Sequence, residues 1–199
     1  MSMHPSPATD YLDLRARMTP ELPENMTAHI DRVVALAMAL ARRHGVNEGR
    51  AALMAQAHDL VRAWKKKDWL AEAERRGLEL SPLEREEPVL LHGPIGALLL
   101  EERGLVADMG VLEAVRHHTT GHPAYSPEAW AMFVADKVEP DKLRRRPELQ
   151  VVADAAERSL EAGALAYLDL MAGDGEYGAR VGHPLAEETR GWLRGRVLG

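Results

Sequence analysis

Apolar side chains recur every three or four positions along most of this chain, which is the period of an amphipathic α-helix. In residues 27–44 these positions are Ile30, Val33, Val34, Ala37, Met38 and Ala41. Gly45 then provides a stop, and Asn47 is placed to cap a second, alanine-rich helix over residues 48–64. The same patterns predict further helices that begin at residue 81 and that cover residues 94–104, 109–118, 126–138, 147–171 and 184–197.

Signals for β-strands are almost absent, because two-residue alternation is rare and runs of β-branched residues are few. The pattern therefore predicts an all-α protein, a compact single-domain helical bundle. Residues 1–20 contain Pro5, Pro7 and Pro20 and are expected to form a loosely ordered lead-in. Residues 21–199 are expected to form the domain.

Composition limits the chemistry that this domain can perform. The chain has 199 residues, of which 46% are hydrophobic, enough for one sizeable core. It has no cysteine, which excludes disulfides, thiolate zinc sites and a cysteine nucleophile. Neither a membrane span nor a signal peptide is evident, so a cytoplasmic protein without a membrane partner is expected. The net charge of −6 argues against nucleic acid as a partner but leaves room for a small anion at a local basic patch.

Several imidazoles and carboxylates fall on the apolar faces of the predicted helices. The pair His58 and Asp59 interrupts the apolar run "MAQAHDLVRAW", and a buried aspartate is costly unless it is paired or bound to a metal. His29 shares a helix face with Val33 and Leu40, and Asp136 follows Phe133 on the apolar side of its helix. Together, His29, His58, Asp59 and Asp136 are typical of a divalent-metal site in a helical core.

Each of these residues also has a simpler interpretation. Taken singly, His29 and His118 are typical of buried, hydrogen-bonded core histidines, and Asp136 or the His58 and Asp59 pair could serve a structural role. The basic runs at residues 65–67 and 144–146 are typical of solvated helix ends, although the second follows Asp136 closely enough to face the site.

The order of His29, the "HD" pair at residues 58 and 59, and Asp136 resembles the HD-domain metal-dependent phosphohydrolases. More specific are the stretches "EREEPVLLHGPIGALLL", "AVRHHTTGHP" and "FVADKVEP". These look like the YqeK-like branch, the bacterial symmetrical diadenosine tetraphosphate hydrolases, which give two ADP and bind iron. The resemblance runs from about residue 27 to the end of the chain, where "HPLAEETRGWL" is similar to the family's closing helix.

This resemblance implies roles for the residues that match it. It implies an iron site, with one or two ions, made by His29, His58, Asp59 and Asp136. It also implies that His92, His117 and His118 surround the nucleotide phosphates. Asp59 is placed to orient or deprotonate the attacking water, while His92 or His118 could stabilise the phosphoryl charge or protonate the leaving phosphate.

The chain departs from the family's pattern at five positions. Met26 and Ile30 stand where the family commonly has an arginine and a small hydroxyl residue, and Arg62 replaces a lysine. The family's "EPGR" reads "EPDK" here, ending at Lys142. Positive charge is kept at Arg62 and Lys142, which are expected to bind the substrate phosphates, and is lost at Met26.

The sequence therefore predicts a metal-dependent hydrolase that cuts diadenosine tetraphosphate and related dinucleoside polyphosphates symmetrically. One alternative is another nucleotide phosphohydrolase of the HD type, such as a nucleoside monophosphate phosphatase. A second is a metal-stabilised nucleotide sensor without turnover. The sequence leaves open the base preference and the oligomeric state, a homodimer included.

Overall fold

The longest helix, α2 (Glu24–Arg43), packs against α3 (Glu48–Ala57) and α8 (Pro127–Val138) in the computed structural model of the chain. The structure describes residues 6–173 and 182–199, which form helices and turns and contain no β-strand. The prediction of an all-α protein is confirmed. None of the helices in these two ranges is long and apolar enough to cross a bilayer.

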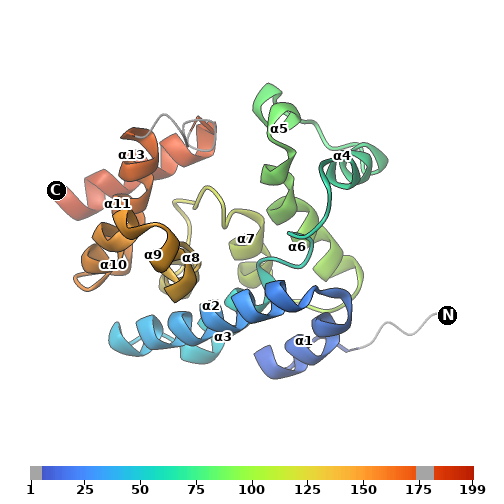
Figure 1. Cartoon of the computed structure of the whole chain (residues 1–199), viewed down its shortest axis with the longest axis horizontal. Helices are drawn as coiled ribbons and strands as arrows, with labels where there is room; N and C mark the ends of the chain where they lie inside the picture. The colour runs from blue at the N-terminus through green and yellow to red at the C-terminus, as the bar shows by residue number, and fades with distance from the viewer. Residues whose placement is uncertain (1–5, 174–181) are drawn as a thin grey trace.

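The helices form two groups above the base made by α2 and α3 (Figure 1). One group has α4, α5 and α6, the other has α10, α11 and α13, and α7 lies between them. The remaining elements are η1 (Thr19–Glu21), α4 (Lys66–Arg75), α5 (Pro82–Glu86), η2 (Pro88–Leu91), α6 (His92–Glu102), α7 (Met109–Arg116), α9 (Pro140–Arg145), η3 (Pro147–Leu149), α10 (Gln150–Ala156), α11 (Leu160–Gly173) and α13 (Pro184–Leu198).

Local capping chemistry sets several helix boundaries where the sequence predicts them. Gly45 ends α2 in a left-handed conformation with φ of 67°, which a residue without Cβ adopts freely. The side chain of Asn47 accepts a hydrogen bond from the backbone of Arg50 and begins α3. Ser81 and Ser126 cap α5 and α8 in the same way.

Helix α3 ends at Ala57, seven residues earlier than the periodicity predicts, and residues 58–64 form turns. The imidazole Nδ1–H of His58 donates to the carbonyl oxygen of Ala55. In a longer helix this carbonyl would accept from the backbone N–H of residue 59. His58 keeps helical backbone angles, with φ of −61° and ψ of −34°, and Asp59 lies in the turn that follows it. The two side chains face one place, since Nε2 of His58 lies 3.4 Å from Oδ2 of Asp59.

Two other stretches differ from the prediction. Residues 147–171 form η3, α10 and α11 rather than one helix, and Ser159 accepts from the backbone of Ala162 where α11 begins. The lysine run at residues 65–67 opens α4 rather than closing a helix, and Trp69 and Ala73 bury one face of it.

Part of the expected lead-in is an ordered helix. Asp10 caps α1 (Tyr11–Met18), and Leu14 and Met18, four positions apart on one face, are completely buried in the core. The prediction of a loosely ordered segment is wrong for these residues, since a single helical turn suffices to bury two apolar side chains. Residues 1–5, at the start of the same predicted segment, lie outside the described residues.

Candidate metal centre

Six titratable side chains from five separate parts of the chain converge at one place. They are His29 on α2, His58 and Asp59 in the turn after α3, His92 at the start of α6, His118 after α7, and Asp136 on α8. All are at most 12% exposed. The structure brings together the four residues predicted as metal ligands and adds His92 and His118 to them.

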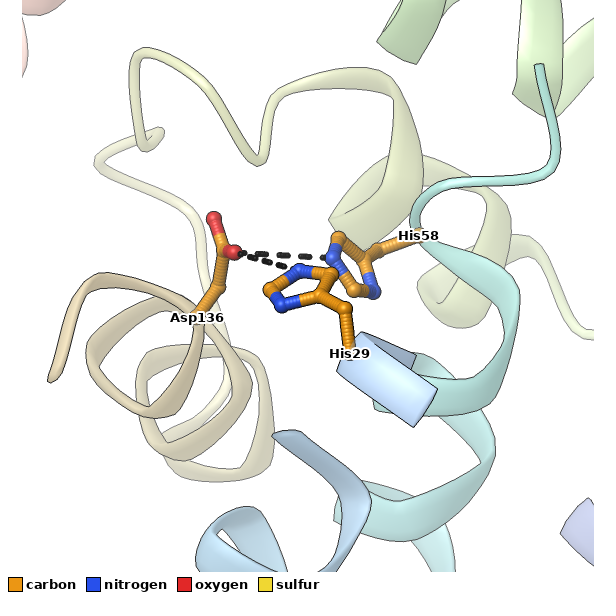
Figure 2. A group of neighbouring side chains, drawn as sticks. All are labelled: His29, His58 and Asp136. Carbon is orange, nitrogen blue, oxygen red and sulfur yellow. Dashed lines mark ion pairs between the residues drawn. The ribbon is translucent and has the colours of Figure 1, made fainter. Parts of the chain in front are cut away.

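The first group consists of His29, His58 and Asp136 (Figure 2). The Oδ1 atom of Asp136 lies 3.4 Å from Nε2 of His29 and 3.6 Å from Nε2 of His58. Ligand atoms about 2.1 Å from a tetrahedral metal ion lie about 3.4 Å from one another. The three donor atoms are therefore spaced as ligands of one ion.

The second group consists of Asp59, His92 and His118. The Oδ1 atom of Asp59 lies 3.2 Å from Nε2 of His92 and 3.4 Å from Nε2 of His118. Its other oxygen, Oδ2, lies 3.4 Å from His58 and 3.6 Å from His29. One carboxylate thus faces both groups.

Hydrogen bonds to the backbone fix the tautomers of three of these histidines. The Nδ1 atoms of His58 and His118 lie 2.7 Å from the carbonyl oxygens of Ala55 and Val115, and His92 contacts the carbonyl of Val89 in the same way. A carbonyl oxygen only accepts, so each Nδ1 carries the hydrogen. The Nε2 atom of each neutral ring therefore presents a lone pair to the centre.

These lone pairs need a shared cation. The Nε2 atoms of His92 and His118 face each other at 2.8 Å, which two lone pairs cannot tolerate without a proton or a metal ion between them or beside them. In the described part of the chain, the buried atoms Nε2 of His58 and Oδ1 of Asp59 have no hydrogen-bond partner. The residues present thus fit a divalent metal, and backbone carbonyls supply the outer hydrogen bonds that orient metal-bound histidines.

Electrostatics keep the carboxylates ionised. Burial opposes the charge of Asp59, but His58, His118 and His92 hold its pKa well below the usual value. The pKa of Asp136 is also held well below its usual value, against burial, by Lys137 and Lys142. Both side chains can therefore act as anionic ligands at any pH near neutrality.

The two most buried histidines have opposite shifts. Burial lowers the pKa of His118 to about 4, so its ring is neutral and ready to bind a metal. Burial also opposes a charge on His58, but Asp59 and Asp136 outweigh it and raise its pKa to about 10. Without metal, a proton on His58 takes up part of the negative charge of the centre.

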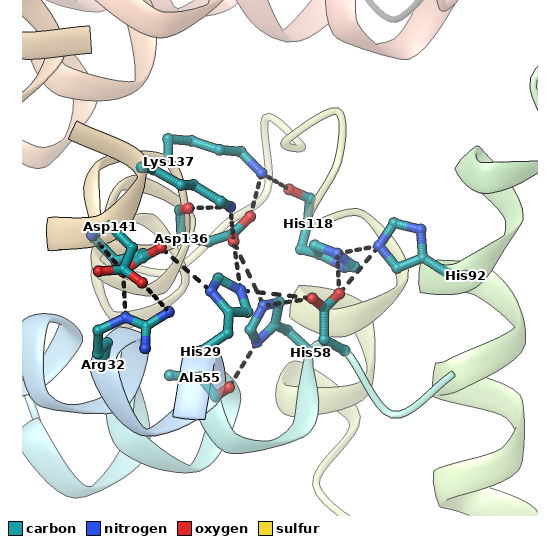
Figure 3. Close-up of polar contacts among 12 residues, drawn as sticks. His29, Arg32, Ala55, His58, His92, His118, Asp136, Lys137 and Asp141 are labelled. Carbon is teal, nitrogen blue, oxygen red and sulfur yellow. Dashed lines mark hydrogen bonds and ion pairs between the residues drawn. The ribbon is translucent and has the colours of Figure 1, made fainter. Parts of the chain in front are cut away.

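Two charged residues beside the centre were missed by the sequence analysis. Lys137 is buried on α8 and donates to Oδ2 of Asp136 at 2.6 Å and to the carbonyl of His118 at 3.0 Å (Figure 3). Its ammonium group also lies 4.8 Å from the centre of the Phe133 ring. Glu139 is fully buried, receives a 2.6 Å hydrogen bond from Arg32, and places Oε1 3.6 Å from Nδ1 of His29. Their signal in the sequence is charge within the otherwise apolar stretch "AWAMFVADKVE".

Two clefts open onto the centre, and both are lined by Asp59, Arg62 and Lys142. The inner cleft runs between η2 and α11, where its wall includes Val89, Leu90, Tyr167, Leu168 and Met171. The outer cleft lies between the start of α2 and α9, where its wall includes Met26, Ala28, Arg32, Asp141, Arg144 and Arg145. The basic run at residues 144–146 therefore reaches the site through its first two members.

The residues expected to bind phosphate differ in their surroundings. Among the described residues, the guanidinium group of Arg62 has no hydrogen bond or ion pair, so it is available to a ligand. Lys142 contacts Oδ1 of Asp136 at 2.6 Å and is therefore held at the centre rather than in solvent.

His117 does not take the expected position beside the substrate. It ends α7, and its Nε2 lies 3.3 Å from Glu113 one turn earlier, while its ring stacks on His122 at 4.9 Å. It lines neither cleft. Of the adjacent histidines, only His118 turns inward, because successive side chains at a helix end point in different directions.

The sequence of residues 26–141 matches the protein family described as the HD domain. This stretch contains all six converging side chains. The chain belongs to the HD-domain family. Members of this HD-domain family bind divalent metals, and the six side chains are the residues of this chain that could hold them. The family resemblance inferred from the sequence is confirmed.

Other HD-domain proteins are similar over most of their length. The chain is 31% identical over 140 residues to a protein of Bacillus subtilis named symmetrical bis(5′-nucleosyl)-tetraphosphatase, covering 70% of this chain and 74% of that protein. It is 31% identical over 149 residues to a protein of the same name from Halalkalibacterium halodurans, covering 75% and 78%. These relatives place the chain in the YqeK-like branch of the HD-domain family.

A solved structure has the same fold. It is a protein from Clostridium acetobutylicum described as a predicted HD superfamily hydrolase involved in NAD metabolism. The TM-score is 0.80, with 24% identity, and the match covers 94% of this chain and 97% of that protein. This likeness supports the HD-domain fold over nearly the whole chain.

Proposed function

We propose that the chain is a metal-dependent phosphohydrolase that cleaves dinucleoside tetraphosphates symmetrically into two nucleoside diphosphates. The observation that carries the proposal is the position of Asp59, which faces both groups of donors at the junction of two clefts. A substrate lying across the junction would place the middle of its phosphate chain there. The name of the two 31% identical relatives supports this choice of substrate.

We propose that the centre holds two ions, one in each group, with Asp59 shared between them. Each group offers two imidazoles and one carboxylate, a donor set typical of non-haem iron(II). Iron is therefore the proposed metal. When bound, the ions would lower the pKa of water and neutralise charge on the phosphoryl group under attack.

In this proposal, His92, His118 and Asp59 hold metal rather than transfer protons. Their free donor atoms lie at ligand spacing from one another, so a bound ion would occupy the lone pairs that a proton transfer would need. A general acid is dispensable, because the leaving nucleoside diphosphate carries a phosphate oxygen that is stable as an anion near neutral pH. Arg62 and Lys142, at the junction of the clefts, bind the phosphate oxygens and stabilise the charge that develops on the leaving group.

The test combines metal analysis with separation of the reaction products. Protein purified with iron should convert diadenosine tetraphosphate to ADP alone, whereas ATP and AMP as products would contradict symmetrical cleavage. Release of phosphate from AMP would instead indicate a nucleoside monophosphate phosphatase. Tight binding of diadenosine tetraphosphate without turnover would indicate a nucleotide sensor. His58→Ala, which removes a proposed ligand, is the matched inactive control.

A further inference from the structure

The two clefts that meet at the metal centre are chemically unlike. A dinucleoside tetraphosphate has two identical halves when both nucleosides are the same, yet each half would lie in a different cleft. The protein can therefore contact a different part of the substrate in each cleft.

The inner cleft offers a surface for a nucleoside. Beyond the residues shared with the outer cleft, its wall includes the aliphatic side chains of Val89, Leu90 and Leu168 and the ring of Tyr167. Such a wall can cover the flat face of a base and remove it from water. The inner cleft is therefore suited to one nucleoside of the proposed dinucleoside tetraphosphate.

The outer cleft offers charge instead. Its lining has five cationic side chains, Arg32, Arg62, Lys142, Arg144 and Arg145, against the carboxylates of Asp59 and Asp141. No phenylalanine, tyrosine or tryptophan lines it within residues 6–173 and 182–199, and Met26 and Ala28 are its apolar members. A local excess of positive charge in a chain of net charge −6 points to a polyanion as the ligand.

Two of these cations are uncommitted. Arg32 and Arg144 pair with Asp141 at 3.2 and 2.9 Å. Arg145 donates only to the backbone carbonyl of Asp141, and Arg62 has no partner in the described part of the chain. Arg62 and Arg145 therefore keep a full charge for phosphate oxygens, at the junction and in the outer cleft respectively.

We infer that the outer cleft recognises phosphates and does not recognise the second nucleoside, so that nucleoside 5′-tetraphosphates are also substrates. This inference rests on the proposed function. In the reaction, the oxygen of water forms a bond to the second or third phosphorus atom, counted from the nucleoside. The bond from that phosphorus atom to the oxygen that bridges the second and third phosphates breaks. The products are a nucleoside diphosphate and pyrophosphate, and one proton is released to solvent.

The experiment compares adenosine 5′-tetraphosphate with diadenosine tetraphosphate on the same iron-loaded protein. We expect ADP and pyrophosphate as products, with kcat/KM within about threefold of the value for diadenosine tetraphosphate, because a stacked base would be worth roughly ten- to a hundredfold. A larger loss, or cleavage to ATP and phosphate, would overturn the inference.

Dissociation constants of both compounds, measured by calorimetry on the metal-loaded protein, separate this inference from the proposed function. Similar constants support phosphate recognition even for a chain that does not turn over. In that case the absence of turnover contradicts the proposed function alone. Binding of diadenosine tetraphosphate that is more than about tenfold tighter would show that the second nucleoside is held.

A pair of charge-matched variants tests the outer cleft directly. The double variant R144Q/R145Q should raise KM for adenosine 5′-tetraphosphate by about tenfold, and by less for diadenosine tetraphosphate, whose outer end lacks the additional terminal charge. The control R85Q/R158Q removes two exposed arginines that line neither cleft. Equal increases in both double variants would mean that net charge alone is responsible, which contradicts recognition in the outer cleft.

Discussion

Lys137 donates from its ammonium group to Oδ2 of Asp136 at 2.6 Å, and the two neighbouring side chains are only 8% and 7% exposed. The same ammonium donates to the carbonyl oxygen of His118. One cation therefore joins a carboxylate of the first group of donors to the backbone that carries a histidine of the second. This lysine therefore links the two groups from outside the set of donor atoms.

Replacing Lys137 by methionine should destabilise the metal-free protein. Removing one partner of a buried ion pair costs about 3–5 kcal/mol, and we expect the lower end because Lys142 still neutralises Asp136. Urea unfolding measures the change. Lys142→Met is the control, since that lysine is 31% exposed and its loss should cost less. An equal or larger loss in the control would contradict the role given to Lys137.

Metal content should distinguish a two-ion centre from a single ion. Each group has its own histidines, so His118→Ala should lower the bound iron from about two to about one per chain, and His58→Ala should do the same from the other side. Elemental analysis of the purified variants measures this. Full metal content in His118→Ala would mean that His118 contacts the substrate phosphates and does not bind metal, as expected from the sequence.

Stability of the metal-free protein should fall as the pH rises from about 7 to 9. The fold raises the pKa of His58 from 6.5 to about 10, so its stabilising contribution is complete below pH 6.5 and is lost as the pH approaches 10. The slope is at most about 1.4 kcal/mol per pH unit. Urea unfolding at several pH values measures it.

Two controls accompany this pH series. His58→Gln should remove the slope, and metal-loaded protein should not show it, because a metal-bound imidazole carries no proton to lose. A flat profile in the metal-free wild type would mean that His58 is neutral in the fold.

Arg62→Ala should reduce kcat/KM by roughly ten- to a hundredfold while metal content and melting temperature stay nearly constant. Its guanidinium group has no partner within the described ranges, so no interaction of the fold is lost with it. Lys142→Ala should reduce kcat/KM similarly but also alter metal content, since Lys142 contacts Asp136. Steady-state kinetics and elemental analysis of both variants give the comparison, and an unchanged kcat/KM in Arg62→Ala would remove that residue from substrate binding.

Helical periodicity identified His29 and Asp136 as polar residues that point inward. His29 and Asp136 lie on long helices, where the position of one apolar residue fixes the direction of its neighbours. The division of the ligands into two groups could not be predicted in this way. It depends on Asp59 lying in a turn, where each side chain has its own direction, and on the early end of α3.

Lys137 and Glu139 were missed for a different reason. Helix α8 is buried from Ala129 to Val138, so its sequence has no polar face against which an inward charge stands out. The same burial gives Lys137 its importance. A charge on a helix that is apolar all round has to have partners inside the protein.

The three backbone carbonyls that hold His58, His92 and His118 each belong to the residue three positions earlier in the chain. No second side chain is needed to choose which ring nitrogen carries the hydrogen, because the backbone acceptor belongs to the same turn as the histidine. The orientation of each of these histidines is set by a short stretch of four residues. A designer who transplants one such helix end, with its histidine, into another helical protein carries the correctly oriented ligand along with it.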